Sequence, residues 1–483
     1  MNKRLIIFIL IICLLFIACT AVYAAGGIYI NSSSSYYEGS LGELFAIGSS
    51  GTLQLSGDGF FALTANGLEQ IITSGNTNPD ETFDPNCGLE YIDGEIKIKS
   101  NTVKVGLKYY YSSGRDSGVV EAKLENAVGS GYAFGYYDTN RNFVELARTS
   151  ETQLSMRVTT GSGIGVYSSV SGELLYQVDY TDSKTMLGIM PLSSASDAIT
   201  WFSGTKYYGG FEYSVLGAGK ITVINVVDIE KYVMGVCASE MGKSWPIEAL
   251  KAQAVAARTY VQKNIMSNTY YTRCGFDVTN DTYCQAYSGC GKLDESIIEA
   301  AESTANRYIT YKGSFIDALY FSSDGGATED NVNVNGNNGH PYLQGKEDPY
   351  EYLTDSINYL SSWQTVFTPS ELAEKLGMSG TVIYVQPGYS QLGNVIRLDI
   401  TSSSGETRTL LRGSCRTGLG LNSIRYTVSL SADGNYVFDG RGWGHNLGMS
   451  QFGAYSMARY FDKNYKDILG FYYTGVGLSY GVI

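Results

Sequence analysis

The stretch CASEMGKSWPIEALKAQAVAARTYV, residues 237–261, decides the fold of this chain. One segment with an apolar pattern ends within this stretch, and a second segment begins after Pro246. Proline is tolerated in the first turn of a helix. In the first segment, four residues recur at helical spacing and share one face: Ile229, Val233, Val236 and Glu240. The pattern therefore predicts two successive helices, with the carboxyl group of Glu240 at the end of an apolar stripe.

The second helix is predicted to be mostly buried, because alanines fill the flanks of its core stripe. The stripe consists of Ile247, Leu250, Ala254, Ala257 and Val261. A guanidinium group in such a helix needs acceptors, so Arg258 must have partners. One interpretation is an ion pair between Arg258 and Glu240 that ties the helices together. The other is chemical: burial raises the pKa of Glu240, which suits a proton donor, and Arg258 orients that carboxyl or binds a substrate oxygen.

Composition narrows the class of function. The chain has 483 residues, which favours two or three domains, and a net charge of −13, which argues against nucleic acid or an anionic lipid surface as partner. Two histidines make a histidine-based metal centre unlikely, and no Ser-His-Asp order, HExxH motif or P-loop is present. The 40 tyrosines favour strands and wet aromatic surfaces.

The N-terminus has the pattern of an export signal. Lys3 and Arg4 precede an apolar stretch, Leu5–Ala18, and a small-residue cleavage site follows at Val22–Ala24. Residues 1–24 are therefore predicted to be a signal peptide or a retained membrane anchor. In either case we expect the mature chain outside the cytoplasm, secreted or membrane-anchored.

Two regions follow the signal. Residues 25–200 contain short runs with period-two alternation, which predict a β-rich N-terminal region. Residues 201–483 mix helical patterns with hairpins, one of them turning at Lys312-Gly313. The predicted fold class is α+β, not a parallel βαβ series.

Two loops could hold a ligand. The small residues of YFSSDGGATED (320–330) leave N–H and hydroxyl groups that can bind a ligand oxygen, unless the loop is an ordinary turn. In GRGWGHNLGMSQFGA (440–454), Trp443 could stack on a sugar ring, and His445 could bond a substrate group or the glutamate. The alternative is a packed tryptophan and a structural histidine.

These motifs together resemble the stage II sporulation protein D family, which also includes the amidase enhancer LytB. The resemblance runs from about residue 205 to 478. It is carried by NVVDIEKYVMGVCASEMGKSWPIEALKAQAVAARTY, FDVTNDTYCQAYSG, ALYFSSDGGATED, HPYLQGKEDPYE, LNSIRYTV and GRGWGHNLGMSQFGAYSMA.

The resemblance implies an exported lytic transglycosylase that cleaves peptidoglycan glycan strands, especially denuded ones, in sporulation or wall remodelling. It implies that Glu240, in the "EM" motif, is the catalytic acid/base. Gln344 replaces the lysine of the family's "PYLK" motif, which leaves the role of that ammonium group open. The predicted substrate-binding residues are Arg258, Gln253, Gln285, Tyr287, Ser322, Ser323, Gly325, Gly326, Tyr342, Gln344, Trp443, His445, Ser450 and Gln451.

Some members of this family hold zinc with cysteine and histidine near the "CQ" motif. Six cysteines remain after the signal: Cys87, Cys237, Cys274, Cys284, Cys290 and Cys415. Cys274, Cys284 and Cys290 lie close together in sequence, but no CxxC pair is present and no histidine lies between them. In an exported chain we predict a disulfide here, with zinc as the alternative and no other cofactor.

The chemistry of a single carboxyl agrees with this resemblance. A lytic transglycosylase needs one carboxyl group, whereas a hydrolytic glycosidase usually needs two. Two other readings remain: a wall-binding amidase enhancer with little catalysis, which implies a cell-wall amidase as partner, and an assembly protein of sporulation. Anhydro ends on digested glycan would distinguish the first reading from the others.

Overall fold

The computed structural model describes two compact units, Met1–Thr82 and Phe83–Ile483. Before residue 88 it describes seven strands. After residue 88 it describes the whole chain except residues 91, 93, 113–114, 127–128, 161–162, 180–185, 193–198, 218, 269, 338 and 355–356. The fold is mixed α+β, as predicted.

The first unit consists of antiparallel strands in its described part, as the β-rich prediction requires. Strands β1 to β4 form one sheet and β5 to β7 another. Their bounds are Tyr23–Ala24, Gly26–Ile30, Ser34–Glu38, Leu44–Gly48, Thr52–Gln54, Gly59–Thr64 and Gly67–Thr73. Residues 1–22 of the predicted signal lie outside the described residues, and so does Cys87. No helix in the described part of the chain is long and apolar enough to cross a bilayer.

The second unit begins with two large sheets. The seven-stranded sheet has the order β14 (Phe143–Thr149), β13 (Tyr132–Tyr137), β18 (Leu187–Pro191), β21 (Gly210–Gly217), β22 (Lys220–Asp228), β9 (Thr102–Lys108) and β23 (Val278–Thr279). The six-stranded sheet has the order β17 (Leu174–Val178), β16 (Ile164–Ser168), β15 (Gln153–Val158), β12 (Glu121–Asn126), β19 (Ile199–Phe202) and β20 (Thr205–Tyr208). A short hairpin joins β10 (Tyr110–Ser112) to β11 (Arg115–Asp116).

The predicted boundary at residue 200 runs through both sheets. Strand β18 pairs with β21, and β12 pairs with β19. The strands of the β-rich region and those that lead into the helices therefore belong to one unit, so the structure places the boundary near residue 82 instead. Period-two alternation found the strands, but it could not show which strands pair across residue 200.

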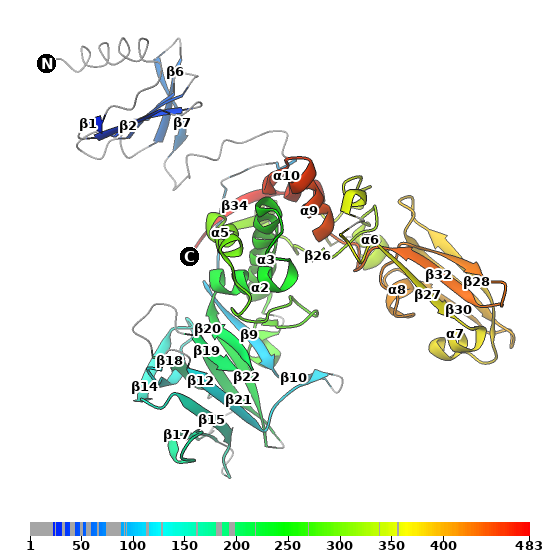
Figure 1. Ribbon diagram of the computed structural model, residues 1–483, viewed down its shortest axis with the longest axis horizontal. Coiled ribbons are helices and arrows are strands. Elements are labelled where there is room, and N and C mark those ends of the chain that lie inside the picture. Colours follow the sequence, from blue (N-terminus) through cyan, green and yellow to red (C-terminus); the bar gives the residue numbers. More distant parts are fainter. Residues whose placement is uncertain are drawn as a thin grey trace. The chain divides into compact units, whose positions relative to one another are not determined.

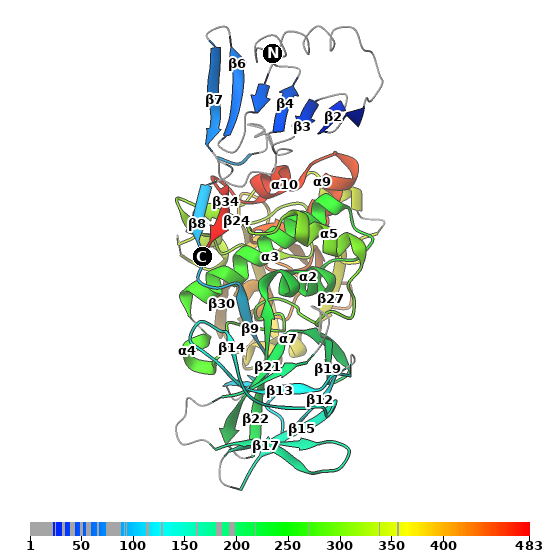
Figure 2. The same ribbon diagram turned by 90° about the vertical axis from the view of Figure 1, so that its left-hand side faces the viewer.

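The predicted helix pair follows directly from β22. Helix α2 (Ile229–Glu240) is capped by the Asp228 side chain, which accepts from the N–H groups of Glu230 (2.9 Å) and Lys231 (3.3 Å). Helix α3 (Ile247–Ser267) begins after Pro246, and its alanines are fully buried. Helices α2, α3 and α5 (Glu295–Ser303) pack side by side (Figures 1 and 2). A single turn of helix, α4 (Tyr271–Cys274), follows α3.

The end of the chain returns to α3. Helices α9 (Gln451–Tyr460) and α10 (Tyr465–Tyr472) both pack against it. A four-stranded sheet has the order β25 (Ser314–Phe315), β24 (Arg307–Tyr311), β34 (Gly477–Val482) and β8 (Gly94–Lys97). The predicted hairpin turn at Lys312-Gly313 is confirmed, with φ of 48° and 73°. A short parallel pair joins β26 (Tyr320–Phe321) to β33 (Met449–Ser450), and α6 (Asn331–Val334) and the 3-10 turn η1 (Glu351–Thr354) lie between these strands in the chain.

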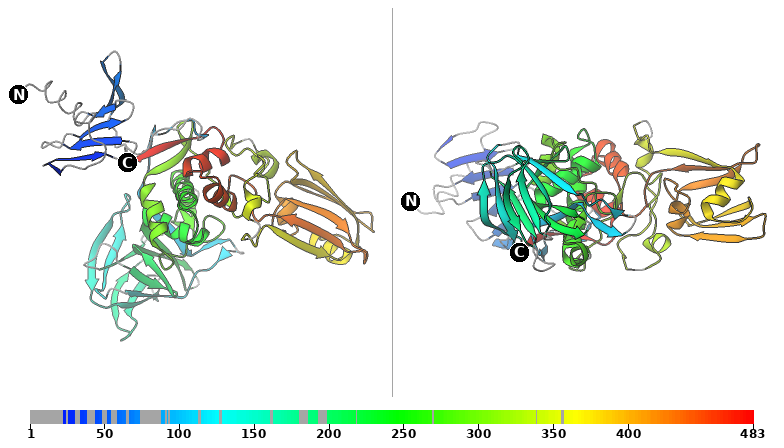
Figure 3. Two further views of the ribbon diagram at one scale, coloured as in Figure 1. Left: turned by 45° about the horizontal axis from the view of Figure 1, so that its top comes forward. Right: turned by 90° about the horizontal axis from the view of Figure 1, so that it is seen from below.

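Residues 362–441 form a small lobe with its own core (Figure 3). One sheet has the order β27 (Ser362–Phe367), β32 (Tyr436–Arg441) and β31 (Tyr426–Leu430). The other has the order β28 (Val382–Tyr389), β29 (Val395–Ser402) and β30 (Thr407–Leu411). Helix α7 (Pro369–Leu376) starts with a capping box between Thr368 and Glu371, and α8 (Ser414–Thr417) is a single turn.

Arg258 is the most completely enclosed charge of the helix cluster. Its side chain is fully buried and pairs with Glu230 of α2, not with Glu240. Nε donates to both Glu230 oxygens (2.9 and 3.1 Å), and Nη2 donates to Oε2 (2.6 Å). Nη2 and Nη1 also donate to the carbonyls of Ala301 (3.1 Å) and Arg307 (3.3 Å). Arg258 therefore joins α2, α3, the end of α5 and the start of β24.

Replacing this guanidinium should destabilise the protein strongly. Arg258→Met keeps the apolar stem but removes the guanidinium that neutralises Glu230 and bonds two carbonyls, so we expect a loss of about 3–5 kcal/mol in the free energy of unfolding. Urea unfolding measures this loss, and adding Glu230→Gln should recover part of it. The control is Arg397→Met, which breaks an exposed, solvent-screened pair with Asp399 and should change the free energy of unfolding far less. Equal losses in the two variants would contradict a structural role for Arg258.

Candidate active site

Glu240, the last residue of α2, lies where three distant segments meet. Its side chain is half-buried. Oε1 accepts from the N–H of Ala286 (2.7 Å) and from the hydroxyl of Tyr320 (3.5 Å), and Oε2 accepts from Nε2 of Gln451 (3.4 Å). Both carboxyl oxygens are thus held by donors, which fixes the orientation of the group.

The surroundings of Glu240 favour its neutral form. Burial raises its pKa, and the hydrogen bonds from Ala286, Gln451 and Tyr320 lower it only in part. None of the groups that shift its pKa is another carboxyl. Glu240 can therefore hold a proton at a higher pH than an exposed glutamate, as a general acid requires.

Tyr320 was not predicted from the sequence, although it directly contacts Glu240. Its hydroxyl accepts from Nε2 of Gln285 (2.9 Å) and donates to Glu240. The other end of the Gln285 amide accepts from the hydroxyl of Tyr232 (3.1 Å). Gln285 therefore sets the direction of the tyrosine's hydrogen bond, and the prediction that Gln285 belongs to the site agrees with this placement.

Two glutamine amides lie on the other side of the carboxyl. Nε2 of Gln451 also donates to Oε1 of Gln253 (3.3 Å), whose side chain is fully buried. Nε2 of Gln253 has no hydrogen-bond partner among the described residues. Both amides can turn over together: Oε1 of Gln451 would then face Glu240, and Nε2 of Gln253 would donate to Gln451. Gln451 can thus present an N–H to a charged Glu240 carboxylate or an oxygen to a protonated one.

His445 acts on Glu240 only through Tyr320. Its Nδ1 accepts from the N–H of Leu447 (3.1 Å), so Nε2 carries the hydrogen and donates to the carbonyl of Tyr320 (3.1 Å). Burial lowers the pKa of His445 to about 4, which keeps the ring neutral. The imidazole therefore positions Tyr320 and does not bond the glutamate, the contact that the sequence suggested.

Aromatic side chains lie near this site. Trp443 is 43% exposed, and its backbone pairs with Ser323 next to β26, so its ring is available for stacking. Trp245, which sequence reasoning did not select, packs on Phe452 and Tyr455 of α9, just beyond Gln451. Such rings can bind the apolar face of a sugar.

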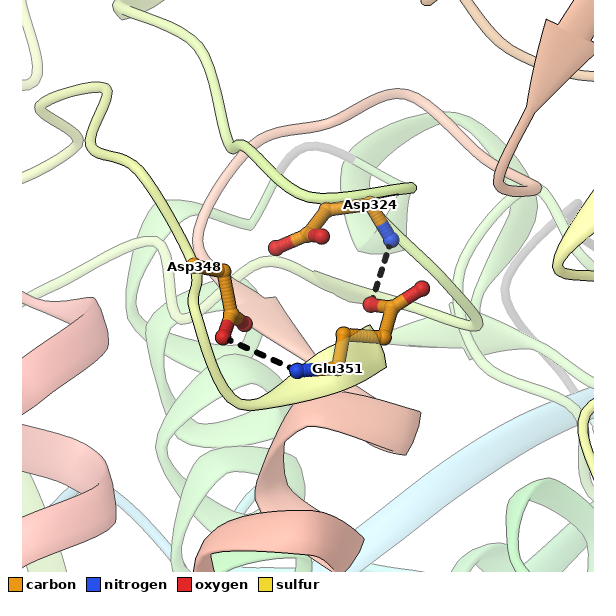
Figure 4. Close-up of side chains that lie close together, drawn as sticks. All are labelled: Asp324, Asp348 and Glu351. Carbon is orange, nitrogen blue, oxygen red and sulfur yellow. Dashed lines mark hydrogen bonds between the residues drawn. The ribbon is translucent and has the colours of Figure 1, made fainter. Parts of the chain in front are cut away.

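The small-residue loop after β26 binds the carboxyl group of Glu351, a side chain of the same protein. Oε1 of Glu351 accepts from the Ser323 hydroxyl and from the N–H of Gly325 (3.1 Å). Oε2 accepts from the N–H of Asp324 (2.8 Å; Figure 4). It also accepts from the hydroxyl of Ser450 (2.6 Å). The expectation that these groups bind substrate is therefore corrected, because Glu351 already occupies them.

The other predicted substrate residues are not brought together with Glu240. Gly326 donates to Asp324, and Tyr287 lies in the core with its hydroxyl on Asn225. Tyr342 bonds Asp317 and His340, Gln344 bonds the carbonyl of Pro341, and Ser322 accepts from Phe452 through its carbonyl. Arg258 is buried against Glu230. These residues support the fold around the site and do not line the carboxyl.

The cysteine prediction is wrong in its preferred form. Cys274, Cys284 and Cys290 are all free thiols, as are Cys237 and Cys415. Cys284 lies beside Tyr260 and Tyr270, whereas Cys290 lies beside Tyr207. The three sulfurs are not among the described groups close enough to share a metal ion. Proximity along the chain did not place them together in space.

The fold and this site define an α+β protein with a half-buried carboxyl, that of Glu240, whose pKa is raised by burial. Residues 217–311 match the family model described as stage II sporulation protein. Stage II sporulation protein D of Bacillus subtilis is 32% identical over 272 residues, 52% of this chain and 75% of that protein. The chain therefore belongs to the stage II sporulation protein D family.

Two further relatives extend this comparison. An uncharacterized protein of Brachyspira hyodysenteriae is 36% identical over 285 residues, 57% of this chain and 73% of that protein. An amidase enhancer of Bacillus subtilis is 30% identical over 292 residues, 51% of this chain and 40% of that protein. The family resemblance read from the motifs is thus confirmed.

The raised pKa of Glu240 predicts how stability depends on pH. Because the folded protein binds this proton more tightly than the unfolded chain, the contribution is present below the unfolded pKa of about 4.3 and is lost as pH rises through the folded pKa. Glu240→Gln removes this dependence. The variant should be more stable than the wild type at pH 7 and equal to it near pH 4, as measured by urea unfolding. A variant that is less stable at pH 7 would show that the charged carboxylate supports the fold.

Removing the tyrosine hydroxyl should raise the pKa of Glu240 further. Tyr320→Phe deletes a donor that stabilises the carboxylate, so the midpoint of a ¹³C NMR titration of the Glu240 carboxyl should move to higher pH. The matched control is Tyr342→Phe, because that hydroxyl bonds Asp317 and not Glu240. An unchanged midpoint in Tyr320→Phe would mean that Tyr320 does not act on this carboxyl.

Proposed function

We propose that this protein is an exported lytic transglycosylase of peptidoglycan, with Glu240 as its only acid/base. The observation that carries the proposal is the environment of Glu240: a half-buried carboxyl with a raised pKa, oriented by three donors and without a second carboxyl among the groups that act on it. A hydrolytic glycosidase usually uses two carboxyl groups, whereas this arrangement supplies one.

The reaction needs two proton transfers, one from Glu240 to the substrate and one from the substrate back to Glu240. Protonated Glu240 gives its proton to the glycosidic oxygen as the bond from C1 to that oxygen breaks, and the bonding electron pair leaves with the oxygen. The resulting carboxylate takes the proton of the sugar's own C6 hydroxyl, whose oxygen bonds C1 and closes the 1,6-anhydro ring. No water is consumed, and Glu240 ends in the protonation state in which it began.

The neighbours of Glu240 suit this cycle. Ala286 and Tyr320 donate to Oε1 in both states, while the Gln451 amide donates to Oε2 and is backed by Gln253, and these two amides can invert together when Oε2 carries a proton. Trp443 supplies an exposed ring for a sugar. The predicted export signal and the family resemblance described above support a glycan strand as substrate, and denuded strands are the form we propose.

The test is digestion of denuded glycan by wild type and by Glu240→Gln, with mass spectrometry of anhydro-muramic ends. Loss of general acid–base catalysis should lower the rate about 10²–10⁴-fold without unfolding the protein. The matched control is Glu302→Gln, which changes an exposed glutamate on α5 and should leave the rate unchanged. Activity retained by Glu240→Gln would contradict the proposed role.

A second function is favoured by one observation, the identity of 30% to an amidase enhancer. In that case the protein would bind the wall and stimulate a cell-wall amidase. Adding a wall amidase to the same digestion separates the two functions. Stimulation of stem-peptide release without anhydro ends, and equal stimulation by Glu240→Gln, would replace the enzyme by the enhancer.

A further inference from the structure

A second group of acidic residues lies beneath the loop after β26, away from Glu240. Asp324 comes from that loop, Asp348 from the segment before η1, and Glu351 from the first residue of η1 (Figure 4). The first two are fully buried and Glu351 is 2% exposed. One oxygen from each lies within 4.8 Å of the others.

Two of these carboxylates are surrounded by donors that stabilise a negative charge. Glu351 accepts from two hydroxyls and two backbone N–H groups, as described above. Asp348 accepts from the N–H groups of Tyr350 (2.9 Å) and Glu351 (3.3 Å) and from the Tyr472 hydroxyl (2.5 Å). The oxygens of Glu351 and Asp348 therefore have donors within the chain, although burial raises the pKa of Asp348.

Asp324 is different, and this difference is the observation that points to a ligand. Its Oδ1 accepts from the N–H of Gly326 (2.7 Å), but its Oδ2 has no hydrogen-bond partner and is buried among the other two carboxyls. A buried polar oxygen without a partner is costly, and more so beside two anions. No lysine or arginine of the described residues forms an ion pair with any of the three. The partner of Oδ2 is therefore either a neighbouring carboxyl, with a proton between the two groups, or a ligand from outside the chain.

We propose that Asp324, Asp348 and Glu351 bind a hard divalent cation of the size of Ca²⁺. Carboxylate and hydroxyl oxygens are the ligands that Ca²⁺ prefers, at about 2.3–2.6 Å, so two ligands of one ion can be roughly 5 Å apart. Mg²⁺ binds at about 2.0–2.1 Å and requires a tighter set, and zinc favours nitrogen and sulfur. The hydroxyls of Ser323 and Ser450 can rotate to turn an oxygen toward the ion, which frees a lone pair on each Glu351 oxygen.

The position of this ion gives it a structural role. It would fasten the loop after β26 to η1, and Ser450 next to it immediately precedes Gln451, which bonds Glu240. The cation therefore stabilises the floor on which the Glu240 site is assembled and takes no part in the chemistry. This inference does not depend on the proposed function.

A proton on Asp324 is the competing occupant, because burial beside Glu351 and Asp348 raises its pKa. The experiment removes metals with EDTA and titrates the full chain with Tb³⁺, whose luminescence is sensitised by a nearby tyrosine such as Tyr472. We expect saturation at one Tb³⁺ per chain and displacement by Ca²⁺ but not by equal Mg²⁺. Asp324→Asn should weaken binding by at least about tenfold, whereas Asp433→Asn, an exposed turn residue, should not.

Thermal unfolding of the wild type decides the matter even if Asp324→Asn does not fold. A free Ca²⁺ concentration of about 100 times its Kd should raise the Tm of EDTA-treated protein by about 3 °C. The proposal is overturned if Ca²⁺ leaves the Tm unchanged and no stoichiometric Tb³⁺ signal appears. In that case Asp324 holds a proton.

Discussion

The burial of the Arg258 guanidinium is the constraint on which the rest of the second unit depends. A charge that has lost its water must find its acceptors within the protein, and the nearest chain segments have to supply them. Here Glu230, Ala301 and Arg307 do so from three elements. Their bonds fix α2 against α3, α5 and β24, which in turn holds the far end of α2, and thus Glu240, in place.

How far sequence reasoning reached is clearest for this residue. The alanine-rich pattern correctly predicted a buried helix and an arginine in need of a partner, but the partner it offered was Glu240, at the end of the preceding helix. The geometry of two successive helices identifies Glu230 as the better partner. At 1.5 Å per residue, Arg258 lies roughly 16 Å along α3 from the turn, and Glu230 lies roughly 15 Å back along α2, so a hairpin of helices brings these two level. Glu240, at the turn, is left free for chemistry.

The site itself was half predictable. Glu240, Gln253, Gln285 and Gln451 were selected by motif, and the structure groups them. Tyr320 was missed because its role depends on a two-residue parallel pairing with β33, which no local pattern announces. The loop 320–330 was predicted either to bind a ligand oxygen or to be an ordinary turn, and in the structure its donors bind Glu351, 27 residues beyond Asp324. Composition can indicate a chemistry without showing whether the partner is a substrate or another part of the same chain.

The short β26–β33 pairing also has a consequence for when the site comes into being. Glu240 and Gln451 are 211 residues apart, and Glu240 and Tyr320 are 80 apart. Contacts of such long sequence separation carry a loop-closure cost and form late in folding. The helix hairpin, by contrast, can form from local contacts alone. As the chain folds, the glutamate therefore has its helix long before it has its donors, and the site is complete only after the last helices have docked.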